Sequence, residues 1–325
     1  MKKIIGIGNA LVDILARIPN DNILTEMGLP KGSMQFVTPQ QQSAIDTWLA
    51  GQDTTIMAGG SAANTIKTIS RLGLEAAFIG KVGNDPMGRQ YYDSLVRQGV
   101  TPMLGIEKEV PTGTAVTFIS ADGQRTFADN LGAAVCMSIS DVPSEILEAY
   151  DTLYIEGYLV ADKPFVETVL QKAQKAGMRI CMDLSSYNVV AENRDFFFQI
   201  IKDYVDIVFA NEEESAMLTE TVPENALQQL GELCDIAVVK LGGKGACAIQ
   251  NGTYYDVAGI MVDEVLDTTG AGDTFAAGFL YALSKGKDIR TCLHLGNIMA
   301  ADIIQHVGAF LPETSWKRLH EEWDL

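Results

Sequence analysis

At 325 residues the chain is long enough for one large α/β domain with a sizeable core, and its 47% hydrophobic and 20% charged residues are typical of a globular protein. The net charge of −18 argues against nucleic acid or an anionic membrane as a partner, because both require basic patches. Five scattered cysteines without a C-x-x-C pair indicate a reducing, cytoplasmic environment and no metal cluster.

The first 18 residues begin with lysines and continue with apolar residues, a pattern that superficially resembles a signal peptide. Asn9 and Asp13 interrupt the apolar run, and no small-residue cleavage site follows it. No segment of the chain approaches ~18 consecutive apolar residues, so no membrane span is predicted. We interpret the amino-terminal segment as the first buried strand.

The next segments alternate between turn-rich and regular patterns. Residues 16–37 are rich in turn formers, a helix is predicted over 62–72, and a strand over 76–83. The stretch 112–130 predicts a β-hairpin, because two alternating apolar and polar runs flank the turn Ala121-Asp122-Gly123. A hairpin inserted into an α/β chain usually forms a flap or a small second sheet over the site.

The carboxyl-terminal two thirds repeats short apolar strands and helical segments. Strands are predicted at Thr152–Gly157, Arg179–Leu184, Asp206–Asn211 and Ile236–Gly242, and helices at Pro164–Ala176 and Pro223–Leu233. This rhythm predicts an α/β fold with a mostly parallel central sheet covered by helices on both faces. We expect one domain over residues 1–325, with a small β-sheet lid built from about 14–38 and 112–130.

Several common catalytic motifs are absent. Gly6-x-Gly8 opens like a dinucleotide-binding fingerprint, but Leu11 occupies the position of the third glycine, which argues against a dehydrogenase. The sequence contains neither a G-x-x-x-x-G-K-[ST] phosphate loop nor an H-R-D loop. Its three histidines crowd into the last 32 residues, which disfavours a histidine relay or a zinc site.

The stretch "DTTGAGDTFAAGF", residues 267–279, carries the most specific chemistry. Helical spacing of apolar residues after Gly272 places Asp273 in the first turn of a helix. Asp273 could simply cap that helix, but a cap does not require Gly270-Ala271-Gly272 before it. Bare amides at a helix amino terminus bind phosphate, and a carboxylate beside them is suited to take a proton from an attacking hydroxyl. We therefore predict that Asp273 is a catalytic base, with Gly270, Ala271 and Gly272 as the anion-binding turn.

This stretch resembles the second signature of the ribokinase (PfkB) family of carbohydrate and nucleoside kinases. "AGGSAANTIKTISRLG" (58–73) is similar to the first signature, and "GKVGNDPMG" (80–88) follows it at the family's spacing. "NEEE" (211–214) matches the family's N-x-x-E, and "KLGGKGA" (240–246) matches its nucleotide-side turn. The resemblance runs in order over nearly the whole chain and implies the ribokinase-like three-layer α/β/α fold.

Within the family, "GNALVD" (8–13), "AGGSAAN" (58–64) and the hairpin are most similar to adenosine kinases. The resemblance implies that Asp13 grips two neighbouring ribose hydroxyls, which a carboxylate can accept together. It assigns further substrate contacts to Asn9, Ser61, Asn64, Arg125 and Tyr158, and a hinge for lid closure to Gly59 and Gly60. Without the resemblance, Arg125 would be interpreted as a solvated charge and Tyr158 as the rim of the core.

The same resemblance implies ATP, Mg²⁺ and K⁺ as cofactors. It places ATP against Asn211, Lys240, Gly242, Gly243, Gly245 and Asn297, and Glu214 near Mg²⁺ through water. Asp267 and Thr269 correspond to the family's monovalent-cation site.

We expect an ATP-dependent kinase acting on the primary, 5′-type hydroxyl of a nucleoside such as adenosine, as a monomer or homodimer. A sugar kinase acting on ribose or fructose, and a non-catalytic ligand-binding protein on the same fold, are the alternatives. A sugar phosphate is disfavoured as substrate, because only Lys31, Arg89 and Arg125 are candidates for a basic cluster.

Overall fold

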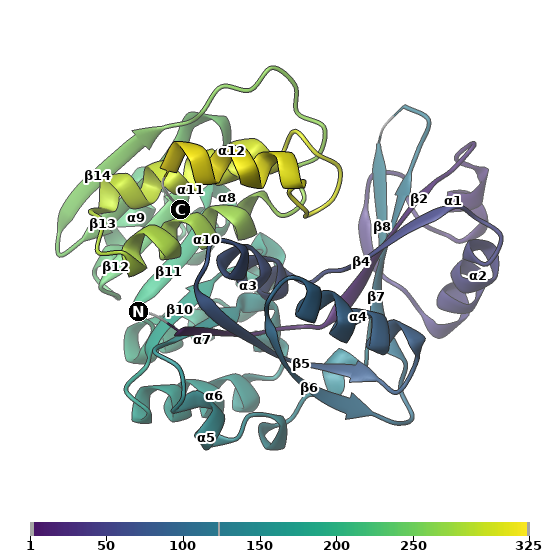
Figure 1. The fold of residues 1–325 in the computed structure, drawn as a ribbon, viewed down its shortest axis with the longest axis horizontal. Coiled ribbons are helices and arrows are strands. Elements are labelled where there is room, and N and C mark those ends of the chain that lie inside the picture. Colours follow the sequence, from purple (N-terminus) through teal and green to yellow (C-terminus); the bar gives the residue numbers. More distant parts are fainter. Residues whose placement is uncertain (1–2, 123, 324–325) are drawn as a thin grey trace.

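Two β-sheets organise the chain in the computed structural model, which describes residues 3–122 and 124–323 (Figure 1). The large sheet has nine strands in the order β14-β13-β12-β11-β10-β9-β1-β5-β6. All neighbours from β12 to β6 pair in parallel, whereas β13 and β14 are antiparallel additions at one edge. In chain order these strands are β1 (Lys3–Ile7), β5 (Glu75–Gly83), β6 (Thr101–Glu107), β9 (Thr152–Glu156), β10 (Arg179–Asp183), β11 (Ile207–Asn211), β12 (Ile236–Lys240), β13 (Gly245–Gln250) and β14 (Thr253–Ala258).

Helices cover both faces of the large sheet and form a three-layer architecture (Figure 1). Alternate side chains of one strand enter opposite cores: Tyr154 packs with the first, and its neighbours Leu153 and Ile155 pack with the second. The first core receives α3 (Ser61–Arg71), α4 (Pro86–Arg97), α10 (Ala271–Ser284), α11 (Ile289–Ile303) and α12 (Glu313–Trp323). The second receives α5 (Ser144–Leu147), α6 (Lys163–Lys175), α7 (Tyr187–Tyr204), α8 (Glu212–Thr219) and α9 (Pro223–Gly231). The predicted α/β fold class is therefore confirmed.

The small sheet has five strands in the order β3-β8-β7-β2-β4 and stands to one side of the three layers, with α1 (Asn22–Glu26) and α2 (Pro39–Leu49) beside it (Figure 1). Its strands are β2 (Leu11–Arg17), β3 (Met34–Phe36), β4 (Thr54–Ala58), β7 (Thr112–Ile119) and β8 (Arg125–Gly132). The predicted hairpin is present as the antiparallel pair β7–β8. Its predicted turn includes Gly123, which lies outside the described residues. The sheet also contains β4, a strand that the sequence patterns did not indicate.

The prediction of one amino-terminal strand is wrong. The chain breaks after Ile7 and resumes at Leu11, so that β1 joins the large sheet and β2 joins the small one. The burial patterns differ accordingly, since four of the five β1 residues are buried, whereas buried and partly exposed residues alternate along β2. The segment that crosses between the sheets, residues 8–10, carries Asn9 of the candidate site.

None of the described helices is both long and apolar enough to cross a membrane. Cys181, Cys247 and Cys292 are buried, whereas Cys136 and Cys234 are partly buried.

Candidate active site

A cavity of about 960 Å³ lies between the two sheets and contains most of the predicted site residues. Its floor is made by the carboxyl ends of the parallel strands β9 to β12 and by the amino termini of α3 and α10. Its opposite wall is the inner face of β2, β7 and β8. Crevices at the carboxyl ends of parallel strands are where open α/β sheets usually bind ligands.

The last residue of each of four neighbouring strands is polar and faces this cavity. These residues are Glu156 of β9, Asp183 of β10, Asn211 of β11 and Lys240 of β12. Asp183 pairs with Glu156 and Asn211 pairs with Lys240. Because Asp183 pairs with Phe209 of β11, the second pair lies two residues further along the strands, on the same face of the sheet. The parallel sheet thus places three potential ligand contacts and one cation along a single edge.

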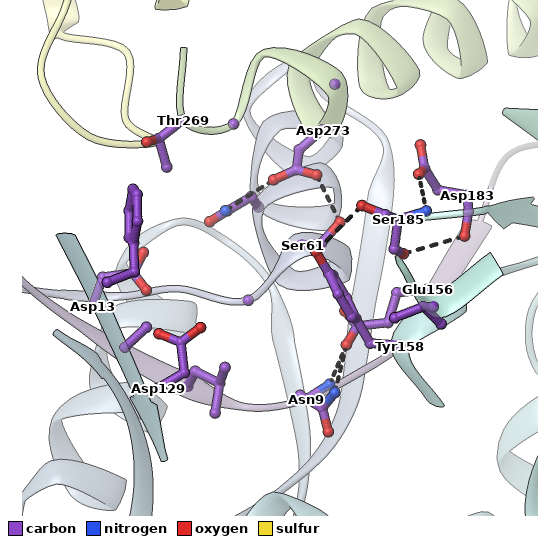
Figure 2. A pocket seen from close by; sticks show the side chains of 18 of the residues that line it. Asn9, Asp13, Ser61, Asp129, Glu156, Tyr158, Asp183, Ser185, Thr269 and Asp273 are labelled. Carbon is purple, nitrogen blue, oxygen red and sulfur yellow. Dashed lines mark hydrogen bonds between the residues drawn. The ribbon is translucent and has the colours of Figure 1, made fainter. Parts of the chain in front are cut away.

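Asp273 reaches across from α10 to α3. Its Oδ1 accepts a hydrogen bond from Ser61 Oγ at 2.7 Å, and its Oδ2 accepts one from Asn64 Nδ2 at 3.0 Å (Figure 2). Burial raises the pKa of Asp273 to about 6, opposed by these two donors. The residue at the N-cap of α10 is Gly270, without a side-chain bond, so Asp273 does not cap the helix. Its carboxylate is instead held at the cavity surface, oriented by two donors from another helix.

The turn before α10 lines the cavity next to Asp273. Gly270 has φ of 77°, a left-handed conformation that favours glycine. A Cβ on Gly272 would lie 3.0 Å from Lys240 Nζ. The amide of Ala271 donates to the Thr268 carbonyl at 3.2 Å, so it is taken by a turn in this structure. Of the three predicted anion-binding amides, those of Gly270 and Gly272 are therefore the better placed to meet a ligand.

Lys240 supplies positive charge beneath this turn. Its Nζ lies 2.7 Å from Asp183 Oδ2, and only 15% of its side chain is exposed. Burial would lower the pKa of Lys240, but the carboxylates of Asp183 and Glu214 outweigh burial and raise it. Lys240 is therefore charged at neutral pH and stands next to the amino terminus of α10, where an anion would be stabilised by both.

Asp13 projects from β2 into the cavity next to the glycine pair. A Cβ on Gly59 would lie within 2.2 Å of all three carboxyl atoms of Asp13, so only glycine leaves room for this carboxylate. Gly60 has φ of 91° and begins α3. Burial raises the pKa of Asp13 to about 7, although the nearby Lys67 opposes the shift. Gly59 thus makes the space that Asp13 occupies, whereas a Cβ on Gly60 would meet the Asn9 carbonyl oxygen.

Asn9 is held by Glu156 rather than turned freely toward a ligand. The backbone amide and the Nδ2 of Asn9 both donate to Glu156 Oε1, at 2.8 and 3.0 Å, and Ala62 N donates to Oε2 at 2.9 Å (Figure 2). Glu156 is 1% exposed, and burial raises its pKa to about 7. The carboxylate fastens the crossing segment between the sheets to the start of α3.

Arg125 joins the small sheet to the loop before α10. Its guanidinium forms an ion pair with Asp267 and lies 3.4 Å from Thr269 Oγ1. Asp267 also accepts from the amides of Thr269 and Gly308, at 2.9 and 2.6 Å. Burial alone would raise the pKa of Asp267, but Arg125 and the two amides hold it below its usual value. The two residues predicted for a monovalent cation are therefore already engaged by an arginine.

Glu214 and Asn211 form a reciprocal capping box at the start of α8. The amide and side chain of Asn211 donate to the two oxygens of Glu214, and the Glu214 amide donates back to Asn211 Oδ1, each at 2.8 Å. Both residues line the cavity, and burial raises the pKa of Glu214 to about 7 despite the charge of Lys240. The pair thus has a structural role at the start of α8, and its predicted contacts with ATP and Mg²⁺ stay predictions.

Some of the remaining predicted residues line the cavity, and the others lie next to it or outside it. Tyr158 and Gly242 line the cavity, and Tyr158 donates to the Ser185 carbonyl at 3.2 Å. Gly243 and Gly245 belong to the adjoining turn, and a Cβ on Gly245 would lie 2.1 Å from the Val257 carbonyl oxygen. Asn297 is not part of the cavity lining, since its Nδ2 donates to the carbonyls of Val257 and Ala258.

Sequence reasoning missed Glu156, Asp183 and Asp129. Glu156 and Asp183 end β9 and β10 and lie one residue before the ends of the predicted buried strands. An acid in that position was the signal that would have found them. Asp129 lies in the predicted hairpin, and only the register of β8 decides that it faces the cavity.

Comparison with known proteins shows the family to which this chain belongs. Residues 32–316 match the model of the pfkB family of carbohydrate kinases. The chain is 32% identical to an uncharacterised sugar kinase of Archaeoglobus fulgidus, over 74% of this chain and 96% of that one. It is 25% identical to adenosine kinase 2 of Arabidopsis thaliana over 95% of this chain and 96% of the relative. The crystal structure of adenosine kinase from Sinorhizobium meliloti superposes with a TM-score of 0.88, at 31% identity over 99% of both chains. The chain belongs to the PfkB family of carbohydrate kinases.

Proposed function

We propose that this kinase transfers the γ-phosphoryl group of ATP to the primary, 5′-type hydroxyl of a nucleoside, with adenosine as the leading candidate. The observation that carries the proposal is the position of Asp273. Its carboxylate is oriented by Ser61 and Asn64, lies beside the amino terminus of α10, and has a pKa near 6. A base with such a pKa is ionised at neutral pH and still able to accept a proton.

The residues around Asp273 fit a bound nucleotide. Lys240, Gly270 and Gly272 all line the cavity, and a Cβ on Gly272 would lie 3.0 Å from Lys240 Nζ. We propose that they hold the phosphates, while Asn211, Gly242 and Gly243 lie on the nucleotide side. Kinases of this family use ATP, which, when bound with Mg²⁺, supplies the phosphoryl group. Asn297 is proposed only to support this side through β14.

The residues also fit a magnesium ion that enters with the nucleotide. In the described part of the chain, no group of three His, Cys, Asp or Glu side chains could by itself enclose a metal. Magnesium is usually held by one or two carboxylates together with phosphates and water. We propose Glu214 for this role through water, since its oxygens already accept from Asn211. We propose no K⁺ at Asp267 and Thr269, because the charge of Asp267 is balanced by Arg125.

On the opposite side, Asp13 is proposed to accept hydrogen bonds from two ribose hydroxyls, with Tyr158 nearby and the small sheet acting as the lid. Asp273 then takes the proton of the primary hydroxyl as its oxygen attacks the γ-phosphorus of ATP, while the bond from that phosphorus to the bridging oxygen breaks and ADP leaves. Excluding water beneath the lid would favour transfer to the sugar over hydrolysis. The adenosine kinases among the similar proteins support a nucleoside, and the named sugar kinases at similar identity keep ribose and fructose as the second candidates.

The test is a coupled ATP-consumption assay over adenosine, inosine, guanosine, ribose and fructose. Among these five substrates, wild-type enzyme should have its highest kcat/KM with a nucleoside. Asp273→Asn should lower kcat by about 10²- to 10⁴-fold, the usual contribution of a general base, and leave the Kd for the substrate within about threefold. Asp288→Asn is the matched control, since Asp288 caps α11 through the Thr291 amide and lies outside the site. Full activity of Asp273→Asn would refute the assigned base, and turnover of sugars alone would refute the nucleoside.

A further inference from the structure

Three residues on the small sheet form one row facing the cavity. Asp13 of β2 pairs with Ala115 of β7, and Ala115 pairs with Asp129 of β8. Residues paired in this way point to the same face of a sheet, and all three line the cavity. Adjacent strands are about 4.8 Å apart, so the two aspartates are separated by about 10 Å at the backbone. The alanine between them is too small to fill that space, which leaves a notch between two carboxylates.

Asp129 is the member of this row with a buried oxygen, its Oδ1, that accepts no hydrogen bond from the described residues. Asp13 faces Lys67, whereas burial is the sole cause acting on Asp129, raising its pKa to about 6. A buried polar atom without a partner is rare in folded proteins and calls for an explanation such as a ligand.

The side chains next to Asp129 on this wall are mostly apolar. On the same sheet face, the next row along the strands contains Leu15, Thr117 and Phe127, which also line the cavity. Leu131 follows two residues later along β8 on the cavity side. The wall is thus apolar apart from the two aspartates, one threonine and Arg125, whose charge is paired with Asp267. Such a wall accepts the faces of a ring, and its carboxylates accept hydrogen bonds at defined points.

Resting on the proposed function, we propose that Asp129 is a specificity-determining residue that accepts a hydrogen bond from the substrate beyond the hydroxyls held by Asp13. The substrate class is an uncharged nucleoside whose base carries an N–H donor, either an amino group or a protonated ring nitrogen. A phosphorylated sugar is excluded from this class, because two carboxylates would repel its phosphate. An analogue without the donor would leave Asp129 unpaired, which is how binding sites reject otherwise similar molecules.

The experiment compares substrates that differ in one donor group. Adenosine, guanosine and inosine each present an N–H on the base edge, whereas purine riboside lacks both an amino group and a ring N–H there. The kcat/KM of each is measured for wild type, Asp129→Ala and the isosteric Asp129→Asn. Asp122→Asn is the control. It removes the same negative charge from the same hairpin, at an exposed residue that forms an ion pair with Lys31.

Wild-type enzyme should prefer at least one donor-bearing nucleoside over purine riboside by tenfold or more. Asp129→Ala should reduce that preference to within about threefold, mostly by slowing the donor-bearing substrate, and Asp122→Asn should preserve it. An unchanged preference in both Asp129 variants would overturn the inference, as would an equal loss in Asp122→Asn.

Failure of the proposed function would be recognised separately, as absence of wild-type turnover with every nucleoside. In that case, the change in melting temperature of the same proteins with the same nucleosides tests whether Asp129 contacts the base. A nucleoside that raises the melting temperature of wild type should raise that of Asp129→Ala less, and purine riboside should affect both equally. Equal shifts for all nucleosides, or no shift at all, would overturn the inference.

Discussion

Five carboxyl groups of the site share one physical property, which is a pKa raised by burial. The pKa is about 6 for Asp273 and Asp129, and about 7 for Asp13, Glu156 and Glu214. Folding removes each carboxylate from water, and the positive groups nearby are too few to offset the cost of burying its charge. Such values near the working pH are frequent at catalytic sites, where a base must be ionised and still bind a proton.

These values predict a steep loss of activity on the acid side. Asp273 must be ionised to accept the proton, and Asp13 must be ionised to accept two hydroxyls, so kcat/KM should be high above about pH 7 and fall below it. Two protonations predict a limiting slope near 2 in a plot of log kcat/KM against pH. Asp13→Asn should lower kcat/KM and reduce that slope to near 1, leaving an apparent pKa of about 6. A rate that stays constant down to pH 5 would contradict both assignments.

At the scale of elements, the amino termini of α3 and α10 converge on the carboxyl edge of the large sheet. Ser61 and Asn64 come from the first turn of α3, and Asp273 comes from the first turn of α10. First-turn amides have no partner within their own helix, so both termini favour negative charge nearby. The sheet contributes Lys240 at the same point. The arrangement concentrates donors where a phosphoryl group would be transferred.

Gly272→Ala tests this arrangement. Alanine is the better helix former by up to about 1 kcal/mol, so the fold should keep or gain stability. The new Cβ would press on Lys240 Nζ and enter the space proposed for phosphate. We expect kcat/KM for ATP to fall by about 10²-fold, while the melting temperature stays the same or rises. Gly51→Ala is the control, because Gly51 is exposed, has ordinary φ and lies outside the cavity. Normal ATP kinetics in Gly272→Ala would place the phosphates elsewhere.

At the scale of the whole molecule, the small sheet is tied to the layered body at separate points. The crossing segment around Asn9 is fastened by Glu156, and the loop before α10 is fastened by the Arg125–Asp267 ion pair. The exposed fractions of the two ion-paired side chains are 16% and 2%. Charge pairs this far from water interact more strongly than surface pairs, and removing one partner leaves the other uncompensated. The pair is therefore suited to hold the small sheet down over the cavity.

Arg125→Ala should loosen this closure. We expect at least tenfold lower kcat with the nucleoside, and a larger share of ATP hydrolysed without transfer, because water gains access to the site. The measurement is the ratio of ADP formed to nucleotide product formed. Arg125→Lys keeps the positive charge but loses the planar guanidinium. Its kcat and its share of hydrolysed ATP should therefore lie between those of wild type and Arg125→Ala. Tight coupling in Arg125→Ala would show that closure does not depend on this contact.

Local sequence patterns were sufficient for the fold class and for much of the secondary structure. The strands β9 to β12, the β7–β8 hairpin and α10 follow from short runs of apolar residues with the right period, and the family resemblance is confirmed by the comparisons. These features depend on neighbours in the chain, so a single sequence shows them. The same is true of Asp273 as a residue in the first turn of a helix.

Tertiary structure alone decided which side chains meet. The first 18 residues look like one strand, because both halves are apolar, yet each half finds a different sheet. The inward direction of Asp129 depends on the register of β8 against β7, since a slip of one residue would turn it to the other face. Glu156 binds Asn9 across 147 positions, and Asp273 binds Ser61 across 212. Contacts between such distant residues arise from packing, which local periodicity does not encode.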